Sequence, residues 1–419
     1  MPSDQVWVPL DAVVSDILDR RGVTPIKLGG DFCSSGHRVI SAKVIKAGRV
    51  QLDADEARYV DAMIYKKWMK TPLQRNDVIM TSEAPLGELA FIGEDVDWVL
   101  GQRLFAIRPI ASIMNGRFLY YALKDPRVFA DILGRASGTT VQGIRQSELR
   151  QVKVPVPALS TQLEVAKLLG TLDDQIDALR ETNITLEAIA QAVFKSWFID
   201  FDPVHTKANG LTPESIDEDT AALFPNEFEE SVFGLIPKGW KIKRLGELLE
   251  LAYGKALKAE ERRGGDVPVY GSGGISGHHD VALVPHGSII VGRKGTVGSL
   301  YWEDRPFYPI DTTFYVKPQL APMTFCFYAM QRLGLEKMNT DAAVPGLNRE
   351  NAYRLNVALP PVNVMAAFDA IASTIRVGIR SNSEEVETLM QLRDSLIPRL
   401  ISGKLRIPEA EELIEAIAA

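Results

Sequence analysis

Short runs of basic and amide side chains in this sequence have the residue types that contact DNA. Arg293 and Lys294 follow the apolar run Ser288–Val291 and precede a glycine, so we expect them at the tip of a turn. Exposed cations on a short turn suit contacts with phosphate or guanine. A solvated surface pair is the alternative interpretation.

Two tetrapeptides share a second pattern of this kind. Gly143-Ile144-Arg145-Gln146 and Gly346-Leu347-Asn348-Arg349 each place a glycine before side chains that make bidentate contacts with guanine or adenine. Alternatively, they organise the junction to the helix that follows. We predict DNA contacts from Arg145, Gln146, Asn348 and Arg349, as well as from the cations at the turn.

Supporting candidates surround these motifs. The glycine-rich stretch Gly271–Gly277 predicts tight turns that bring backbone N–H groups near phosphate, with simple hairpin turns as the alternative. His286 is the only further histidine close to His278 and His279, so we expect a polar or DNA-facing loop and no metal site. The remaining predicted DNA contacts are Arg135, Thr139, Thr140, Lys255, Lys258, Arg262, Arg263, Ser272, His278 and His279.

Motifs for catalysis are missing from the sequence. It contains no G-x-x-x-x-G-K-[ST] phosphate loop. The segment Asp200–Pro203, Asp-Phe-Asp-Pro, partly matches an amino-methyltransferase motif but lacks the second proline and the aromatic residue that would hold a flipped base. We expect no catalytic residue and no cofactor in this chain. A stand-alone DNA methyltransferase is the alternative, which methyl transfer by the purified chain would test.

The elements that would position these residues occur twice. DVIMTSEAPLGEL from Asp77 matches SIIVGRKGTVGSL from Ser288 with a shift of 211 residues. LFAIRP matches TFYVKP with a shift of 209, and the segments from Thr140 and Ala343 match with a shift of 203. The order is preserved, which indicates a weak internal duplication. Ser82 and Glu83 stand where the second copy has its basic turn, so the two turns are expected to read different features.

Each copy has the same order of elements. Short alternating apolar runs rich in Gly and Pro predict a β-rich domain, and a proline cluster ends it. A helical run follows at about residues 160–198 and 363–401, with Ser160 and Asn363 as expected N-caps. Pro398 should loosen or end the second helix.

Both helical runs show alternating four- and three-residue apolar spacing, which predicts a coiled-coil seam. An amphipathic helix packed on its own domain is the alternative. The predicted seam consists of Leu172, Ile176, Leu179, Asn183 and Leu186 in the first run and Ile375, Ile379, Asn382, Val386 and Leu389 in the second.

Asn183 and Asn382 are the single amides of their seams. An antiparallel pairing would bring them face to face, so that each satisfies the other, since an unpaired buried amide is costly. A helix of about 38 residues spans ~57 Å, more than one turn of B-DNA. The sequence thus predicts two similar modules separated by two long antiparallel helices.

Composition limits the class of protein. The chain has 419 residues, 46% hydrophobic, which is enough for at least two domains. We find no signal peptide and no apolar stretch approaching the ~20 residues of a membrane span. The two cysteines, Cys33 and Cys326, lie far apart, so a cytoplasmic location without disulfides is expected.

The formal net charge of −7 argues mildly against nucleic acid, but its distribution is uneven. Residues 1–155 contain 21 basic and 18 acidic residues, and residues 240–355 contain 15 and 12, so each segment has a net charge of +3. The remaining residues sum to −13, which places the acid in the connectors.

The sequence resembles the specificity subunits of type I restriction-modification enzymes over essentially its whole length. The segments that carry the resemblance are LEAIAQAVFKSWFIDFDPV from Leu186, FGLIPKGWKIKRLGEL from Phe233 and LMQLRDSLIPRLISGKL from Leu389. VPVYGSGGISGHHD from Val267 and IIVGRKGTVG from Ile289 resemble parts of the family's target-recognition domains. The first copy lacks the Ile-Pro-x-Gly-Trp start and has VWVPLDAVV instead.

The resemblance implies an α+β protein that reads a bipartite DNA site, one half per target-recognition domain. It implies helices that fix the spacing and dock two modification subunits, which methylate adenine, and restriction subunits that translocate and cleave DNA. S-adenosylmethionine, ATP and Mg would belong to these partners. A coiled-coil scaffold without DNA specificity is a further alternative.

The expected division of the chain follows from the repeat and the resemblance together. It comprises recognition domain 1 (1–157), helix 1 (158–199), an acidic linker (200–238), recognition domain 2 (239–361), helix 2 (362–405) and a C-terminal tail (406–419).

Overall fold

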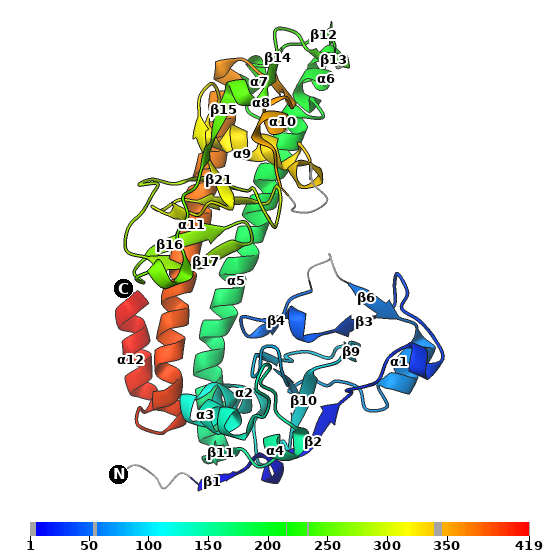
Figure 1. Cartoon of the computed structure of the whole chain (residues 1–419), viewed down its shortest axis with the longest axis vertical. Helices are drawn as coiled ribbons and strands as arrows, with labels where there is room; N and C mark the ends of the chain where they lie inside the picture. Colours follow the sequence, from blue (N-terminus) through cyan, green and yellow to red (C-terminus); the bar gives the residue numbers. More distant parts are fainter. Residues whose placement is uncertain (1–5, 53–56, 215, 233, 339–345, 419) are drawn as a thin grey trace. The chain divides into compact units, whose positions relative to one another are not determined.

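The structure, a computed structural model, describes residues 6–52, 57–214, 216–232, 234–338 and 346–418 (Figure 1). The chain forms two compact units. Unit 1 consists of Met1–Ala178 and Glu385–Ala419, and unit 2 consists of Leu179–Glu384. The division passes through the two long helices, α5 (Leu159–Phe198) and α11 (Val362–Ile401). Each unit therefore combines one β-rich domain with part of both helices.

Unit 1 is built around a four-stranded antiparallel sheet of order β2-β10-β7-β8. A three-stranded sheet β6-β3-β9 and the pairs β1-β11 and β4-β5 complete it. The strands are β1 (Val6–Pro9), β2 (Val14–Asp19), β3 (His37–Ile40), β4 (Ile45–Lys46), β5 (Arg49–Val50), β6 (Arg58–Val60), β7 (Val78–Thr81), β8 (Leu89–Phe91), β9 (Val99–Leu100), β10 (Leu104–Pro109) and β11 (Lys153–Val156).

Unit 2 repeats this topology with the order β15-β21-β18-β19, the sheet β17-β16-β20 and the pair β14-β22. A hairpin, β12-β13, is additional. The strands are β12 (Phe228–Ser231), β13 (Gly234–Pro237), β14 (Lys241–Arg244), β15 (Leu249–Tyr253), β16 (Val267–Gly271), β17 (Gly274–His279), β18 (Ser288–Gly292), β19 (Leu300–Glu303), β20 (Tyr308–Pro309), β21 (Thr313–Pro318) and β22 (Asn356–Leu359).

The register confirms the duplication. Phe105 of β10 lies opposite Asp19, and the matching Phe314 of β21 lies opposite Tyr253. Both three-stranded sheets contain one antiparallel and one parallel pair, β3 with β9 and β16 with β20. The fully buried strands β7 and β18 form the centre of each core, because every residue in them is apolar, small or hydrogen-bonded.

Short helices cover these sheets. Unit 1 contains α1 (Ala62–Trp68), α2 (Gly116–Lys124), α3 (Pro126–Arg135) and α4 (Gln146–Leu149). Unit 2 contains α8 (Leu245–Leu248), α9 (Met323–Gln331) and α10 (Arg349–Tyr353). Asn115 begins α2, where its Oδ1 accepts a hydrogen bond from the backbone N of Phe118 at 2.9 Å.

The long helices are antiparallel within each unit. In unit 1, Asp173 of α5 pairs with Arg393 of α11, and Gln175 pairs with Glu385. In unit 2, Asn183 pairs with Asn382, and Glu187 pairs with Arg376. Residue numbers rise along α5 as they fall along α11, which is the antiparallel order.

The side chains of the predicted seam are withdrawn from solvent. Leu172, Ile176, Val386 and Leu389 are buried, and Leu179, Asn183, Leu186, Ile375, Ile379 and Asn382 are half-buried. The Nδ2 of Asn382 donates to the Oδ1 of Asn183 at 2.8 Å. The Nδ2 of Asn183 donates to Ser383 Oγ at 3.2 Å and to the carbonyl of Ile379 at 3.3 Å. The amide pair thus has partners on both sides.

The expected linker at 200–238 is folded. It contains α6 (Asp202–Ala208), α7 (Glu218–Ala222) and the β12-β13 hairpin. Val204, Phe224 and Ile236 are buried in the core of unit 2, which holds the segment in place despite its acidic composition.

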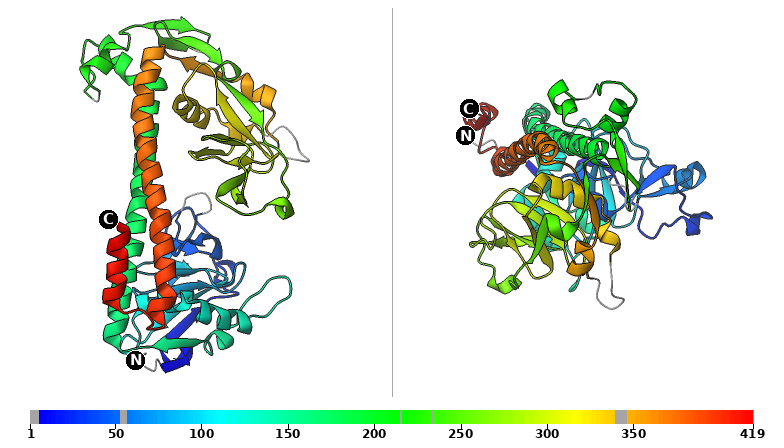
Figure 2. Two further views of the ribbon diagram at one scale, coloured as in Figure 1. Left: turned by 90° about the vertical axis from the view of Figure 1, so that its left-hand side faces the viewer. Right: turned by 90° about the horizontal axis from the view of Figure 1, so that it is seen from above.

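The expected C-terminal tail is also structured. It forms α12 (Ile407–Ala418), which lies beside the last part of α11 (Figures 1 and 2). Ala410 is fully buried, and Glu409 accepts a hydrogen bond from the backbone N of Arg406 at 3.0 Å. The helical spacing of the apolar residues Ile407, Ala410 and Leu413 predicts this helix from the sequence.

The helix ends differ from the expectation in two respects. The long helices begin at Leu159 and Val362, so Ser160 and Asn363 lie inside the first turn, whose N–H groups have no intrahelical acceptor. Pro398 lies within α11, which continues to Ile401. Burial of Leu396 and Leu400 on either side of the proline stabilises this last turn.

One part of α11 is strongly apolar. Within α11, an 18-residue window has a mean hydropathy of 1.4, a value that a membrane-spanning helix also reaches. In unit 2 the same helix contributes the Asn382 amide and the Arg376 guanidinium to polar contacts with α5. Phe368 and Ala372 of this helix are buried in the core of unit 2.

Candidate nucleic-acid interface

The two motifs singled out in each copy lie together in each unit. In unit 1, the turn after β7 receives a hydrogen bond from Ile144 N to the carbonyl of Ser82 at 3.0 Å, and Glu83 forms a β-bridge with Gly143. In unit 2, Leu347 N donates to the carbonyl of Arg293 at 2.8 Å, and Lys294 forms a β-bridge with Gly346. The same site therefore occurs once in each unit.

Local packing fixes this arrangement. Ile144 and Leu347 are 2% and 4% exposed and anchor the two tetrapeptides in their cores. The next residues, Arg145 and Asn348, are exposed. Because β7 and β18 are buried along their length, the turns that follow them are the first positions at which side chains reach the surface.

In unit 2 the site is rich in cations and contains an exposed aromatic ring. The guanidinium carbons of Arg293 and Arg349 lie 4.9 and 5.0 Å from the ring centre of Tyr253, which is 49% exposed. Lys294 is exposed at the tip. The side chain of Asn348 caps α10 by accepting from the backbone N of Glu350, so its acceptor is already in use.

In unit 1 the cations of the site are paired with carboxylates. Arg21 covers the ring of Phe105 at 5.1 Å and makes bidentate contacts with Asp19 at 2.8 and 2.5 Å. Arg103 pairs with Glu83 at 3.1 Å. The amide of Gln146 donates to the carbonyl of Ile17 at 2.5 Å, so it stabilises the fold at this position.

A groove of about 570 Å³ adjoins the turn in unit 1. Basic and aromatic side chains line it, among them Arg38, Arg58, Arg103, Phe32 and Trp68. Arg58 lies 5.3 Å from the ring of Phe32, and Arg38 lies 5.8 Å from the ring of Tyr59. The interpretation of the sequence missed these cations because they occur singly among apolar residues, without a motif.

The other predicted DNA contacts in unit 2 differ in their exposure to solvent. Lys255, Lys258, Arg263 and His278 are exposed, whereas His279 is only 6% exposed and accepts a hydrogen bond from the backbone N of Arg263. Arg262 donates to the carbonyl of Ser276 at 2.5 Å, and Ser272 Oγ accepts from Thr296 N at 3.3 Å. The glycine-rich stretch forms the β16-β17 hairpin, which was the alternative interpretation.

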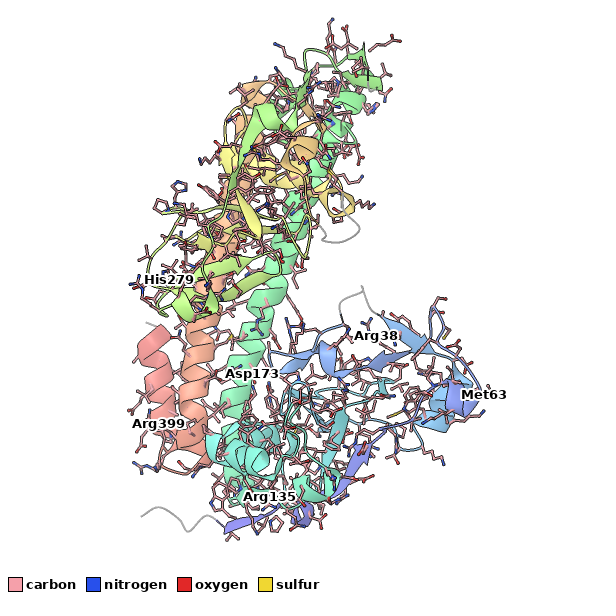
Figure 3. All side chains as sticks on the ribbon, viewed as in Figure 1. Arg38, Met63, Arg135, Asp173, His279 and Arg399 are labelled. Carbon is pink, nitrogen blue, oxygen red and sulfur yellow. The ribbon has the colours of Figure 1, made fainter. Side chains whose placement is uncertain are left out.

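In unit 1, Thr139 and Thr140 are exposed in the loop before Gly143. Arg135 is engaged by Asp131 at 2.8 Å and by Glu148 at 3.5 Å. It lies on a different side of the unit from Arg38 (Figure 3). Among the described residues, no group of three or more His, Cys, Asp or Glu side chains is placed to hold a metal ion.

A matched polar triad joins each β-rich domain to the helices. In unit 1, the hydroxyl of Tyr121 donates to Asp173, which pairs with Arg393 at 2.6 Å. In unit 2, Tyr328 donates to Glu187, which pairs with Arg376 at 3.4 Å. Burial, followed by the charge of Asp173, raises the pKa of Tyr121, so this hydroxyl stays a donor.

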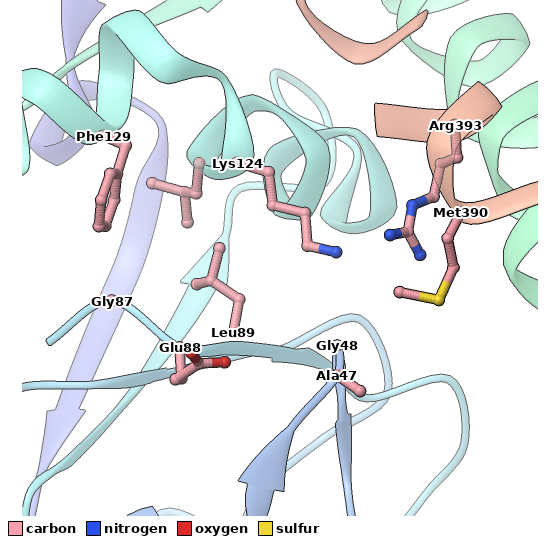
Figure 4. A pocket seen from close by; sticks show the side chains of 10 residues that line it. Ala47, Gly48, Gly87, Glu88, Leu89, Lys124, Phe129, Met390 and Arg393 are labelled. Atoms are coloured by element: carbon pink, nitrogen blue, oxygen red, sulfur yellow. The ribbon is translucent and has the colours of Figure 1, made fainter. Parts of the chain in front are cut away.

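A smaller pocket of about 260 Å³ lies beside this triad in unit 1 (Figure 4). Lys124 and Arg393 contribute the nitrogen atoms of its lining. The Nζ of Lys124 lies 4.5 Å from the ring centre of Tyr120. Burial, followed by the nearby charge of Arg393, lowers the pKa of Lys124 to about 8.

Comparisons with known proteins agree with this architecture. The model of the type I restriction modification DNA specificity domain matches residues 14–188 and 237–368, one match in each copy. The HindI specificity subunit of Haemophilus influenzae is 26% identical over 407 residues, which covers 80% of this chain and 88% of that protein. The MjaIX specificity subunit of Methanocaldococcus jannaschii is 24% identical, covering 80% and 79%.

A solved structure has the same fold. The crystal structure of a type I restriction-modification S subunit from M. genitalium superposes with a TM-score of 0.51 at 18% identity, covering 95% of this chain and 96% of that one. The family model spans most of the sequence and matches once in each unit. The chain therefore belongs to the type I restriction-modification DNA specificity family and is a specificity subunit.

Proposed function

We propose that each unit of this subunit reads one half of a bipartite DNA sequence. The observation that carries this proposal is the recurrence of one surface site, the turn after β7 or β18 bridged to a glycine tetrapeptide, with different side chains in the two copies. A duplicated scaffold with divergent contact residues is what two different half-sites require.

The long helices would set the spacing between the half-sites and dock the modification subunits. Each has 40 residues, a length of ~60 Å at ~1.5 Å per residue. Ile184 and Val377 are 66% and 68% exposed, and Ile189 is 46% exposed. Exposed apolar side chains on helices that are otherwise paired support their use as contacts for partner subunits.

This subunit would act without catalysis of its own. Two modification subunits would supply adenine methylation with S-adenosylmethionine, and restriction subunits would supply ATP- and Mg-dependent translocation and cleavage. The assembly would act on double-stranded DNA in the cytoplasm. Neither a stand-alone methyltransferase nor a scaffold without DNA specificity accounts for a family match in both copies.

Genome-wide mapping of N6-methyladenine tests the proposal. Cells that carry the gene with its modification subunits should methylate one asymmetric bipartite sequence with a fixed spacer, and deletion of this gene should abolish that methylation. Methylation that persists without the gene, or a continuous recognition sequence, would contradict the proposal.

A further inference from the structure

We propose that the stack Arg293–Tyr253–Arg349 in unit 2 binds DNA phosphates, and that it contributes more salt-dependent affinity than the matched site of unit 1. The inference rests on the proposed function and deepens it, because it assigns phosphate binding to one of the two matched sites. The geometry of the two matched sites carries it.

The stack holds two guanidinium groups beside one ring. Arg293 and Arg349 come from different segments of unit 2, yet both lie within about 5 Å of the ring centre of Tyr253. Cation–π contact restricts the two long side chains at little cost to their remaining N–H donors. Tyr253 is thus a positioning residue for two cations at the surface.

The charges of Arg293 and Lys294 lack a carboxylate partner among the described residues, and that of Arg349 is partly compensated by Glu350. In the part of unit 2 that the structure describes, no carboxylate lies within 4 Å of Arg293 or Lys294. Arg349 forms one ion pair, between its Nε and Glu350 Oε1 at 3.6 Å, which is too long for a hydrogen bond, and this buried Nε has no hydrogen-bond partner. The guanidinium of Arg293 uses one donor, which bonds to the carbonyl of Asp311 at 2.9 Å.

The matched site of unit 1 is compensated. The position of Tyr253 is occupied by Asp19, because each lies opposite the matching phenylalanine of the neighbouring strand. Asp19 holds Arg21 over Phe105, and Glu83, which stands where unit 2 has Lys294, holds Arg103. The position of Arg349 is Gln146, whose amide bonds to the backbone of β2.

Counterion release turns this difference into a measurable asymmetry. Each phosphate neutralised by a protein cation contributes about 0.9 to the slope of log affinity against log salt. A cation that is already paired with a carboxylate gains little from phosphate. The stack of unit 2 should therefore contribute more to the salt dependence than the matched, compensated site of unit 1.

The test measures DNA binding by the full chain assembled with its modification subunits, by fluorescence anisotropy between 0.05 and about 0.2 M salt. Arg293→Ala and Arg349→Ala should each reduce the salt slope by about 0.9 and weaken binding roughly five- to tenfold at about 0.1 M salt, equally on cognate and random DNA. Tyr253→Leu should weaken binding roughly threefold or more although it removes no charge, and Tyr253→Phe should bind as the wild type does.

Matched variants control for net charge and for folding. Lys241→Gln removes an exposed charge elsewhere in unit 2 and should leave the slope nearly unchanged. Asp19→Asn with Arg21→Gln removes the paired site of unit 1 without changing the net charge, and it should also leave the slope unchanged. Equal slopes for the Arg293 and Lys241 variants, or normal binding by Tyr253→Leu, would overturn the inference.

Two outcomes separate the inference from the proposed function. A wild-type complex that binds cognate and random DNA equally would refute the proposed function itself. Suppose instead that the wild-type complex prefers cognate to random DNA, while the Arg293 or Arg349 variants lose recognition of one base pair only. The proposed function would then stand, and the assignment of these residues to phosphate would be overturned.

Discussion

Lys124 shows how one side chain couples pH to the stability of unit 1. Its amino group lies in the pocket beside Arg393, above the ring of Tyr120, and the charges of Asp173, Asp394 and Glu88 act on it in the opposite sense to Arg393. Burial and Arg393 together lower its pKa from 10.5 to about 8. Between these two values the unfolded chain binds a proton that the folded chain does not, so the stability rises with pH across this window.

Below pH 8 the full cost of burying the charged amine is present. We therefore expect Lys124→Met to stabilise the protein at pH 7 by about 1 kcal/mol, after allowance for partial exposure and for the lost cation–π contact. The gain should shrink as the pH rises towards 10. Urea unfolding of variant and wild type at pH 7.0 and at about pH 9.5 measures both quantities. A variant that is less stable at pH 7, or a difference independent of pH, would contradict this account.

At the scale of elements, the buried pair Asp173–Arg393 joins α5 to α11 in unit 1, and Tyr121 of the β-rich domain donates to the same carboxylate. The two side chains are 17% and 7% exposed. Arg393→Ala leaves a buried carboxylate without its cation and should destabilise the protein by roughly 3–5 kcal/mol. Asp173→Asn combined with Arg393→Gln should cost clearly less, and a double-mutant cycle in urea measures the coupling.

The matched control is the surface pair Arg380–Glu384, whose side chains are 50% and 54% exposed. Arg380→Ala should leave the stability nearly unchanged, because water already solvates both groups. If the two alanine variants were equally stable, the buried triad would have no special role in joining the domain to the helices.

The amide pair Asn183–Asn382 sets the register of the helices in unit 2. Replacing both residues with Leu extends the apolar seam, so we expect a gain of roughly 1–2 kcal/mol together with a looser register. Asn183→Leu alone should destabilise, because Asn382 then loses its acceptor. Cysteines at Leu186 and Gly378, which face each other, report the register by disulfide trapping in a Cys33→Ser background. Unchanged trapping and stability in the double variant would exclude a role in register.

Periodic elements could be predicted from the sequence better than irregular ones. Heptad spacing and the internal repeat predicted both long helices, the duplicated sheets and the single amide of each seam, since these features recur along the chain. The fold of residues 200–238 was missed because isolated apolar anchors such as Val204 and Phe224 are outnumbered by acidic residues. Helix α12 was overlooked although its apolar spacing was present.

Contact residues were harder to predict than elements, for a physical reason. Exposure of a cation depends on partners that are distant in sequence, such as Asp77 for Arg108 at 2.7 Å, which no local motif contains. Among the predicted contacts, His279 proved buried, and Arg135 and Gln146 proved engaged in the fold. The sequence did not predict DNA contacts from Tyr253, Arg38 or Arg58, because a single aromatic or basic residue in a strand matches no binding motif.

At the scale of the whole molecule, the uneven distribution of charge makes an acidic chain compatible with DNA binding. The chain is acidic overall, at −7, but both β-rich segments are mildly basic, and the acid lies in the helices and connectors. The sites proposed to contact DNA are therefore separated in sequence from the surfaces expected to meet other proteins. A duplicated, modular reader of this kind should change its specificity one half at a time.

The central claim is that each unit reads its own half of the DNA site. The most direct measurement is N6-methyladenine mapping after residues 240–355 have been exchanged for the corresponding segment of another family member with a known recognition sequence. We predict that one half of the methylated sequence changes to that of the donor, while the other half and the spacer length stay as in the wild type. A simultaneous change in both halves, in an exchanged subunit that still supports methylation, would contradict the claim.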